Sequence, residues 1–169
     1  YCDFISFENK DELIENYIET LILEIENESK KISKEEYEIT TIYFGGGTPS
    51  FIDSKYIIKI LGKIKENFNL NNPEITIEIN PGTVNENKLK NYFENGINRI
   101  SIGLQETNND LLKILGRIHT YEEFLNTYEL ARKIGYENIN VDLMIGLPNQ
   151  SIANIKDSLN KIINLNPEH

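Results

Sequence analysis

Two glycine-rich segments follow apolar runs in positions where a ligand could reach the backbone. Gly45-Gly46-Gly47-Thr48-Pro49 follows one run, and Gly146-Leu147-Pro148 follows another. Glycine leaves the neighbouring N–H and C=O groups open, because it has no Cβ and tolerates positive φ. The alternative for the triple glycine is a plain flexible turn. No Lys follows in the spacing of a P-loop, so phosphate binding is disfavoured.

Two carboxylates interrupt apolar runs of the chain. Glu78 lies between two isoleucines, and Asp142 lies between a valine and a leucine. Burial of an unpaired charge is costly, so each carboxylate needs a partner or a ligand. The structural alternative is an ion pair, with Arg99 or Arg117 as the candidate partner. Two such residues on neighbouring strand ends favour a functional site.

The remaining candidates for chemistry are few. His119 precedes a predicted helix, in a position that fits a surface or capping residue. The chain shows no His/Cys/Asp cluster with metal-ligand spacing and no recognisable Ser/His/Asp grouping, so hydrolase chemistry has no support. Cys2 is the single cysteine, which excludes an internal disulfide and fits a reducing cytosol.

The elements that must position these residues alternate along the chain. Apolar, β-branched runs predict buried strands at residues 39–44, 75–79, 99–103 and 139–145. Apolar residues three and four apart predict helices at 11–31, 54–67 with Ser54 as its cap, 85–94, 110–115, 121–134 and 152–163. This order predicts parallel βα units with right-handed crossovers, as in a doubly wound sheet or a (β/α) barrel. Since a complete barrel takes about 250 residues, a barrel here would be partial. In both folds the site lies at the carboxyl ends of the strands.

Composition narrows the function classes. The 169 residues hold 17 basic and 27 acidic side chains, a net charge of −10, which argues against nucleic acid as a partner. No apolar run approaches the roughly 20 residues of a membrane span, and no secretory signal is recognisable, so we expect a cytoplasmic location.

Six segments together resemble one known family. They are Tyr1-Cys2-Asp3-Phe4, GGGTPS at 45–50, EINPGT at 78–83, RISIGLQ at 99–105, LGRIH at 115–119 and DLMIGLP at 142–148. The chain resembles radical S-adenosylmethionine (SAM) enzymes, and more narrowly the oxygen-independent coproporphyrinogen III oxidase family with its haem-chaperone branch. The resemblance implies an α/β fold, a partial (β/α) barrel of parallel strands of radical SAM type, truncated at both ends.

The resemblance also implies cofactors. In this family three cysteines in a CxxxCxxC motif hold a [4Fe–4S] cluster, and the fourth iron binds SAM. Cys2 matches the third cysteine and is the implied metal ligand. Residues 1–169 are therefore expected to be a fragment of a radical SAM core domain, inactive by itself, without the upstream cluster cysteines and the C-terminal domain. The implied cofactor-binding residues are Tyr1, Gly46, Gly47, Thr48, Glu78, Gln105, Arg117 and Asp142. No catalytic residue is assigned.

The resemblance leaves the function between two branches. The family's reduced cluster splits SAM into methionine and a 5′-deoxyadenosyl radical, which the oxidase uses to decarboxylate the propionates of coproporphyrinogen. The oxidase branch usually has a further cysteine where Phe4 stands here. This difference favours the chaperone branch, which binds haem and transfers it to acceptor proteins. The alternatives are the oxidase itself and a βα domain whose glycine turns and carboxylates are purely structural.

Overall fold

Four parallel strands form one sheet in the computed structural model, which describes residues 10–169. The strands are β1 (Ile39–Phe44), β2 (Leu70–Ile79), β3 (Arg99–Gln105) and β4 (Ile139–Leu143). Their order in the sheet is their order in the chain, and each neighbouring pair is parallel. A doubly wound sheet reverses its strand order at a switch point. The consecutive order therefore confirms the predicted α/β class and favours the partial barrel.

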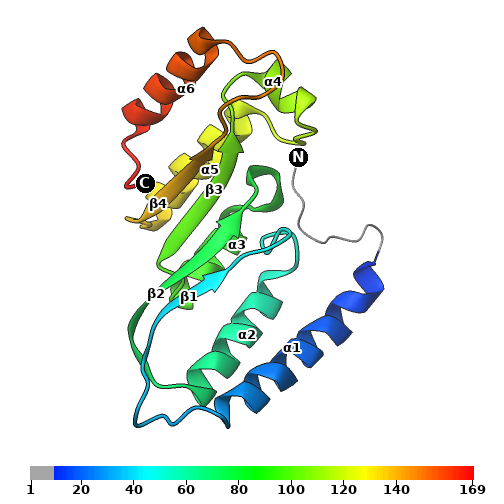
Figure 1. Cartoon of the computed structure of the whole chain (residues 1–169), viewed down its shortest axis with the longest axis vertical. Helices are drawn as coiled ribbons and strands as arrows, with labels where there is room; N and C mark the ends of the chain where they lie inside the picture. Colours follow the sequence, from blue (N-terminus) through cyan, green and yellow to red (C-terminus); the bar gives the residue numbers. More distant parts are fainter. Residues whose placement is uncertain (1–9) are drawn as a thin grey trace.

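The helices lie close to their predicted positions. They are α1 (Ile14–Ser29), α2 (Ser54–Asn67), α3 (Glu86–Glu94), α4 (Asn109–Ile114), α5 (Tyr121–Ile134) and α6 (Ile152–Leu165), with 3-10 turns η1 (Asp11–Leu13) and η2 (Pro81–Thr83). α1 lies alongside α2, and its buried Ile18 and Ile22 form a second apolar cluster with Ile60 of α2 (Figure 1). No helix within residues 10–169 combines the length and apolar character needed to cross a membrane.

The hydrophobic core lies between the helices and one face of the sheet. Alternate strand residues such as Ile77, Ile102 and Ile139 are buried in one cluster with helix residues such as Leu89 and Phe124. Because side chains alternate across a strand, the residues between them lie on the other face, which we call the inner face. On β2, β3 and β4 the inner face carries Thr76, Glu78, Ser101, Gly103, Asn140 and Asp142. The fold thus presents a polar surface opposite its core.

Three local expectations were wrong. Strand β1 is not buried: it is the edge of the sheet, and Tyr43 on it is 57% exposed. Strand β2 begins at Leu70 rather than at residue 75, because its first half also pairs with β1, from Leu70 opposite Ile39 onward. The cap of α2 is Asp53, whose carboxylate accepts a hydrogen bond from the Lys55 amide, and not Ser54.

Candidate functional site

Glu78 joins β2 to the glycine turn that follows β1. Its Oε1 accepts a 2.9 Å hydrogen bond from the Tyr43 hydroxyl, and its Oε2 accepts a 3.2 Å hydrogen bond from the Gly46 amide. Partial burial of the hydroxyl, together with the Glu78 carboxylate, raises the pKa of Tyr43 to about 12. The structural alternative, an ion pair from Glu78 to Arg99, is not among the contacts of the described residues; Arg99 Nε lies 3.9 Å from Glu74 Oε1 instead. Glu78 is instead stabilised by neutral donors from the neighbouring strand.

The glycine turn is open on its outer side. Gly46 and Gly47 have φ values of +81° and +57°, and a Cβ added to either would meet no atom of residues 10–169 within 4 Å. Positive φ strains most other residues, so the conformation favours glycine, and none of the described side chains fills the space beside the turn. Thr48, the third predicted residue of this segment, is exposed, and its carbonyl accepts a hydrogen bond from the Phe51 amide in a turn.

Asp142 lies on the same face, but β3 separates it from Glu78. The register pairs Glu78 with Ser101, Ser101 with Asn140, and Gly103 with Asp142. The Asp142 carboxylate accepts hydrogen bonds from Asn140 Nδ2 at 2.7 Å and from Ser101 Oγ at 3.4 Å. The two carboxylates therefore lie on strands two apart, and not on adjacent strands as the sequence analysis assumed.

Gln105 and Arg117 meet above Gly103. The Arg117 Nη2 atom donates a 2.6 Å hydrogen bond to the Gly103 carbonyl. A Cβ on Gly103 would lie 3.0 Å from Gln105 Nε2 and 3.2 Å from Arg117 Nη2. Glycine at this position thus lets a long amide and a guanidinium share the end of β3. Since Gly103 is in register with Asp142, the three polar side chains gather at one edge of the sheet.

We call Gly46, Gly47, Glu78, Gln105, Arg117 and Asp142 the strand-end site. The structure places these six predicted residues at the carboxyl ends of the strands, on or beside the inner face. Thr48 lies farther along the glycine turn and, within residues 10–169, bonds Phe51 rather than a member of this site. The predicted cofactor residue Tyr1 and the predicted metal ligand Cys2 lie outside the described residues.

His119 is buried, contrary to its expected surface or capping role. It is 3% exposed, and its ring nitrogens lie 3.1 Å from Asn80 Oδ1 and 3.3 Å from the Leu104 carbonyl oxygen. Burial, and then the charge of Arg117, lowers the pKa of His119 to about 4. The residue that caps α5 is Thr120, in a capping box with Glu123. His119 therefore ties the loop that carries Arg117 to the ends of β2 and β3.

Glu106 is a second buried group that the sequence analysis did not identify. It is 1% exposed and follows Gln105 directly. Four donors surround its carboxylate, from Thr107, Asn108, Gln150 and Ser158. The sequence gives no periodic signal for this burial, because the apolar alternation of β3 ends before it.

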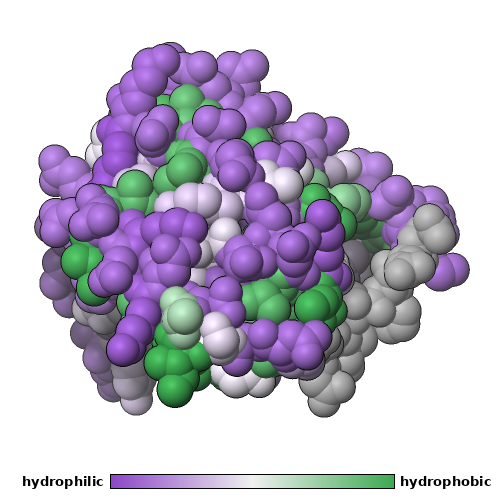
Figure 2. Space-filling model, turned by 90° about the horizontal axis from the view of Figure 1, so that it is seen from above, coloured by the Kyte–Doolittle hydropathy of each residue, from purple (hydrophilic) through white to green (hydrophobic). Residues whose placement is uncertain are grey.

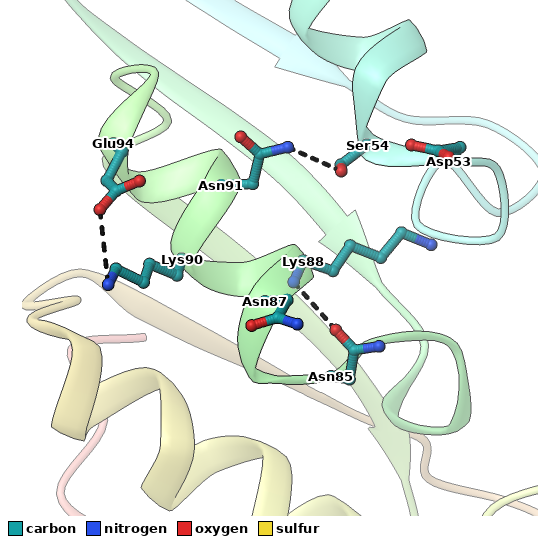
Figure 3. Close-up of a pocket in the computed structure, with 8 residues that line it drawn as sticks. All are labelled: Asp53, Ser54, Asn85, Asn87, Lys88, Lys90, Asn91 and Glu94. Carbon is teal, nitrogen blue, oxygen red and sulfur yellow. Dashed lines mark hydrogen bonds and ion pairs between the residues drawn. The ribbon is translucent and has the colours of Figure 1, made fainter.

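A depression of about 620 Å³ lies elsewhere, between α2 and α3. Its lining is polar and largely paired within itself: Asn91 bonds Ser54, Asn85 caps α3, and Lys90 pairs with Glu94 (Figure 3). No residue of the strand-end site lines it. The view from above the molecule shows a largely hydrophilic surface with separate apolar patches (Figure 2). Exposed Phe51, Ile118 and Ile145 lie in the loops after β1, α4 and β4.

Sequence comparisons with known proteins all point to the same family. Residues 1–162 match the sequence profile of the Radical SAM superfamily. Over its whole length the chain is 42% identical to the "Heme chaperone HemW" of Buchnera aphidicola subsp. Schizaphis graminum and 38% identical to that of Escherichia coli. The chain spans 45% of the length of each of these relatives.

Solved structures agree with these matches. Coproporphyrinogen III oxidase (HemN) from Escherichia coli, described as a radical SAM enzyme, superposes with a TM-score of 0.88 at 27% identity. The match covers 99% of this chain and 38% of that one. The archaeal Elp3 of Methanocaldococcus infernus shares the fold at a TM-score of 0.66 and 20% identity. The likeness to HemN confirms the predicted radical SAM type of fold.

Proposed function

Because the chain belongs to the radical SAM superfamily, we propose that the strand-end site binds SAM and that the whole protein is a haem chaperone. The observation that carries the SAM-binding part is the contact between Glu78 and Gly46. It places a carboxylate and open glycine backbone from two strands at one point of the carboxyl edge. The chaperone part rests on relatives named heme chaperone HemW, which match the whole chain at 35–42% identity.

The residues of the strand-end site fit the chemistry of SAM. Each Glu78 oxygen accepts one described hydrogen bond and keeps capacity for a donor such as the SAM ammonium. Asp142 is exposed, so its carboxylate is open to ribose hydroxyls. Gly46 and Gly47 leave room for a ligand against the backbone. The Arg117 guanidinium suits the SAM carboxylate, and the Gln105 amide suits either a donor or an acceptor.

The cluster belongs to the same proposal. Cys2 would be one thiolate ligand of a [4Fe–4S] cluster, with Tyr1 beside it, and two cysteines upstream in the whole protein would complete the set. When bound, the cluster and SAM supply the reductive cleavage of the sulfonium bond. The described residues orient SAM through hydrogen bonds, and the packed face of the sheet keeps their strands rigid. The relatives are more than twice as long as this chain, and their further length is where a C-terminal domain for haem would lie.

Phe4 favours the chaperone over the oxidase. The resemblance implies a fourth cysteine at this position in the oxidase branch, and this chain has phenylalanine. The partners of the whole protein are then SAM, haem and a cytoplasmic haem-acceptor protein. The oxidase alternative takes coproporphyrinogen in place of haem.

One experiment tests the proposal with the full-length protein, meaning this chain with the upstream cysteines and the C-terminal region. After anaerobic reconstitution we expect about four irons per chain and 5′-deoxyadenosine from added SAM. Glu78→Gln and Asp142→Asn should each weaken SAM binding, while Glu137→Gln, at an exposed position between α5 and β4, should not. Reconstitution without a cluster would refute the radical SAM part and leave the strand-end residues structural.

A second assay separates the two branches. The full-length protein is titrated with haem and, separately, incubated with coproporphyrinogen III, SAM and a reductant. Stable haem binding without decarboxylation supports the chaperone. Appreciable decarboxylation overturns the chaperone and supports the oxidase.

A further inference from the structure

The buried Glu106 carboxylate accepts hydrogen bonds from four residues at the end of β3. Its Oε1 accepts from the Thr107 amide at 2.8 Å, from the Asn108 amide at 3.2 Å and from the Ser158 hydroxyl. Its Oε2 accepts a 2.6 Å hydrogen bond from Gln150 Nε2. Burial by itself raises the pKa of Glu106, but the hydrogen bonds from Ser158, Gln150 and the two amides outweigh it and lower the pKa. Glu106 is therefore a charged group held in the interior.

Gln150 uses its whole amide to close the loop after β4. Its Oε1 accepts hydrogen bonds from the Gly146 amide at 2.8 Å and the Leu147 amide at 3.2 Å. Its Nε2 donates to the Met144 carbonyl at 3.0 Å as well as to Glu106. The carboxylate accepts hydrogen bonds only, so Gln150 must turn its Nε2 toward Glu106. The Glu106 charge thereby fixes which end of the amide faces the Gly146 and Leu147 amides.

The 144–150 loop contacts Gln105, a strained residue of the strand-end site at the end of β3. Gln105 has φ +74°, a left-handed conformation that is uncommon for a residue with a side chain. The β3–β4 register shifts between Gly103 and Gln105, and the Met144 amide donates a 2.8 Å hydrogen bond to the Gln105 carbonyl. Strain of this kind persists only where surrounding contacts determine the conformation. Two groups hold this segment in place. The Met144 amide bonds the Gln105 carbonyl, and the buried Glu106 carboxylate anchors the residue that follows Gln105.

We propose that Glu106 is a positioning residue which, through Gln150 and the 144–150 loop, holds Gln105 in the geometry that the strand-end site needs. The inference rests on the proposed SAM-binding function for its effect on affinity. Its structural part, the coupling of Glu106 to the backbone of the 144–150 loop, stands independently of that function. Glu106 acts through other residues, and the inference gives it no contact with SAM.

The sharpest test exchanges donor and acceptor between the two side chains. In Glu106→Gln the new amide oxygen stays with the three donors from Thr107, Asn108 and Ser158, so its NH₂ faces Gln150 Nε2, donor against donor. Gln150 must then turn, which places its Nε2 against the Gly146 and Leu147 amides. In the double variant Glu106→Gln with Gln150→Glu, the carboxylate at position 150 accepts from the amide at position 106 and from both loop amides. The swap loses the bond to the Met144 carbonyl, which then faces a carboxylate oxygen, so we expect the recovery to be incomplete.

The measurements use the full-length protein and two readouts. We expect Glu106→Gln to speed hydrogen exchange in the 144–150 peptide and to raise the KM for SAM about tenfold with a smaller change in kcat. The swapped double variant should recover most of both effects. Glu129→Gln makes the same change at an exposed position of α5 and should leave both readouts unchanged.

The outcomes separate this inference from the proposed function. Unchanged exchange and unchanged KM in Glu106→Gln would overturn the positioning role. If that variant does not fold, Gln150→Ala keeps three of the four donors to Glu106, and unchanged exchange in its loop overturns the role equally. A parent protein that never cleaves SAM refutes the proposed function, while hydrogen exchange still decides the coupling of Glu106 to the loop.

Discussion

The Tyr43 hydroxyl donates a 2.9 Å hydrogen bond to Glu78 Oε1, linking the exposed edge strand β1 to β2 at the carboxyl end of the sheet. The formation of this bond depends on a third residue, Gly45, which lies beside both side chains. A Cβ on Gly45 would lie 2.6 Å from the Tyr43 ring and 3.2 Å from the Glu78 carboxyl carbon. Gly45 therefore lets the tyrosine lie close enough to orient the carboxylate, although its φ is not unusual.

Replacement of Gly45 by alanine tests this arrangement. The new methyl group must displace the Tyr43 ring and break its bond to Glu78, so we expect the free energy of unfolding to fall by about 1–2 kcal/mol. Gly62→Ala is the matched control, because it lies inside α2 and, among residues 10–169, no atom outside its own helical turns comes within 4 Å of the added Cβ. That change should raise the free energy of unfolding by about 0.5–1 kcal/mol. Urea unfolding of both variants measures the difference, and effects of equal sign would contradict the prediction.

Gly103→Ala should disturb ligand binding more than folding. Its Cβ would lie within 3.2 Å of the ends of the Gln105 and Arg117 side chains, which are flexible enough to move away. The fold tolerates that movement, but both groups leave their places in the strand-end site. We expect SAM affinity of the full-length protein to fall about tenfold or more. Gly82→Ala is the control, since its nearest neighbour is Ile118 at an ordinary 3.7 Å. Equal SAM affinities in calorimetric titrations of the two variants would count against the prediction.

The strand-end site could be predicted in outline because its residues interrupt a strong local pattern. Glu78 and Asp142 each replace an apolar residue in a run with the period of a strand, and the parallel βα order brings strand ends to one edge. The order of the strands needed the structure, since local periodicity does not report which strands are neighbours. The sequence therefore did not predict that β3 lies between the strands that carry Glu78 and Asp142.

The buried polar groups could not be predicted in the same way. Glu106 is stabilised by Ser158, 52 residues away, and His119 by Asn80, 39 residues away. Contacts of this range depend on how the loops fold over the strand ends, and no spacing in the sequence encodes them. The apolar periodicity did predict a helix at 121–134, where α5 lies, so the position of His119 just outside that helix was predictable, but its burial was not.

Gly47 offers a test of backbone strain without steric conflict. Its φ is +57°, and an added Cβ would meet no atom within 4 Å in the described part of the chain. Gly47→Ala should therefore cost about 1–2 kcal/mol of unfolding free energy through strain alone. Gly47→Asn should cost less, because asparagine is enriched in the left-handed region. Thermal or urea unfolding gives the order of the two variants. An alanine variant as stable as the parent would show that the turn can adopt another conformation.

His119 should make folding stability depend on mild acid. Its pKa in the folded chain is lowered to about 4, first by burial and then by Arg117, against about 6.5 when unfolded. Between these values the unfolded chain binds a proton that the folded chain does not. The free energy of unfolding should therefore fall by up to about 1.4 kcal/mol for each pH unit as pH decreases from about 6.5. Glu106, Glu122 and Glu168 have lowered pKa values and lose their contributions only below their unfolded pKa of about 4.5.

Between pH 6.5 and 5, the change in the free energy of unfolding therefore reports on His119. Urea unfolding is measured across this interval for the parent and for His119→Gln, whose amide keeps one donor and one acceptor near the imidazole positions but does not titrate. The variant should be less stable than the parent at pH 7, because its amide cannot reproduce both contacts with Asn80 and Leu104. Its stability should nevertheless change little between pH 6.5 and 5, while that of the parent falls. Parallel pH profiles for the two proteins would show that His119 does not carry the acid sensitivity, and the burial argument for its lowered pKa would then fail.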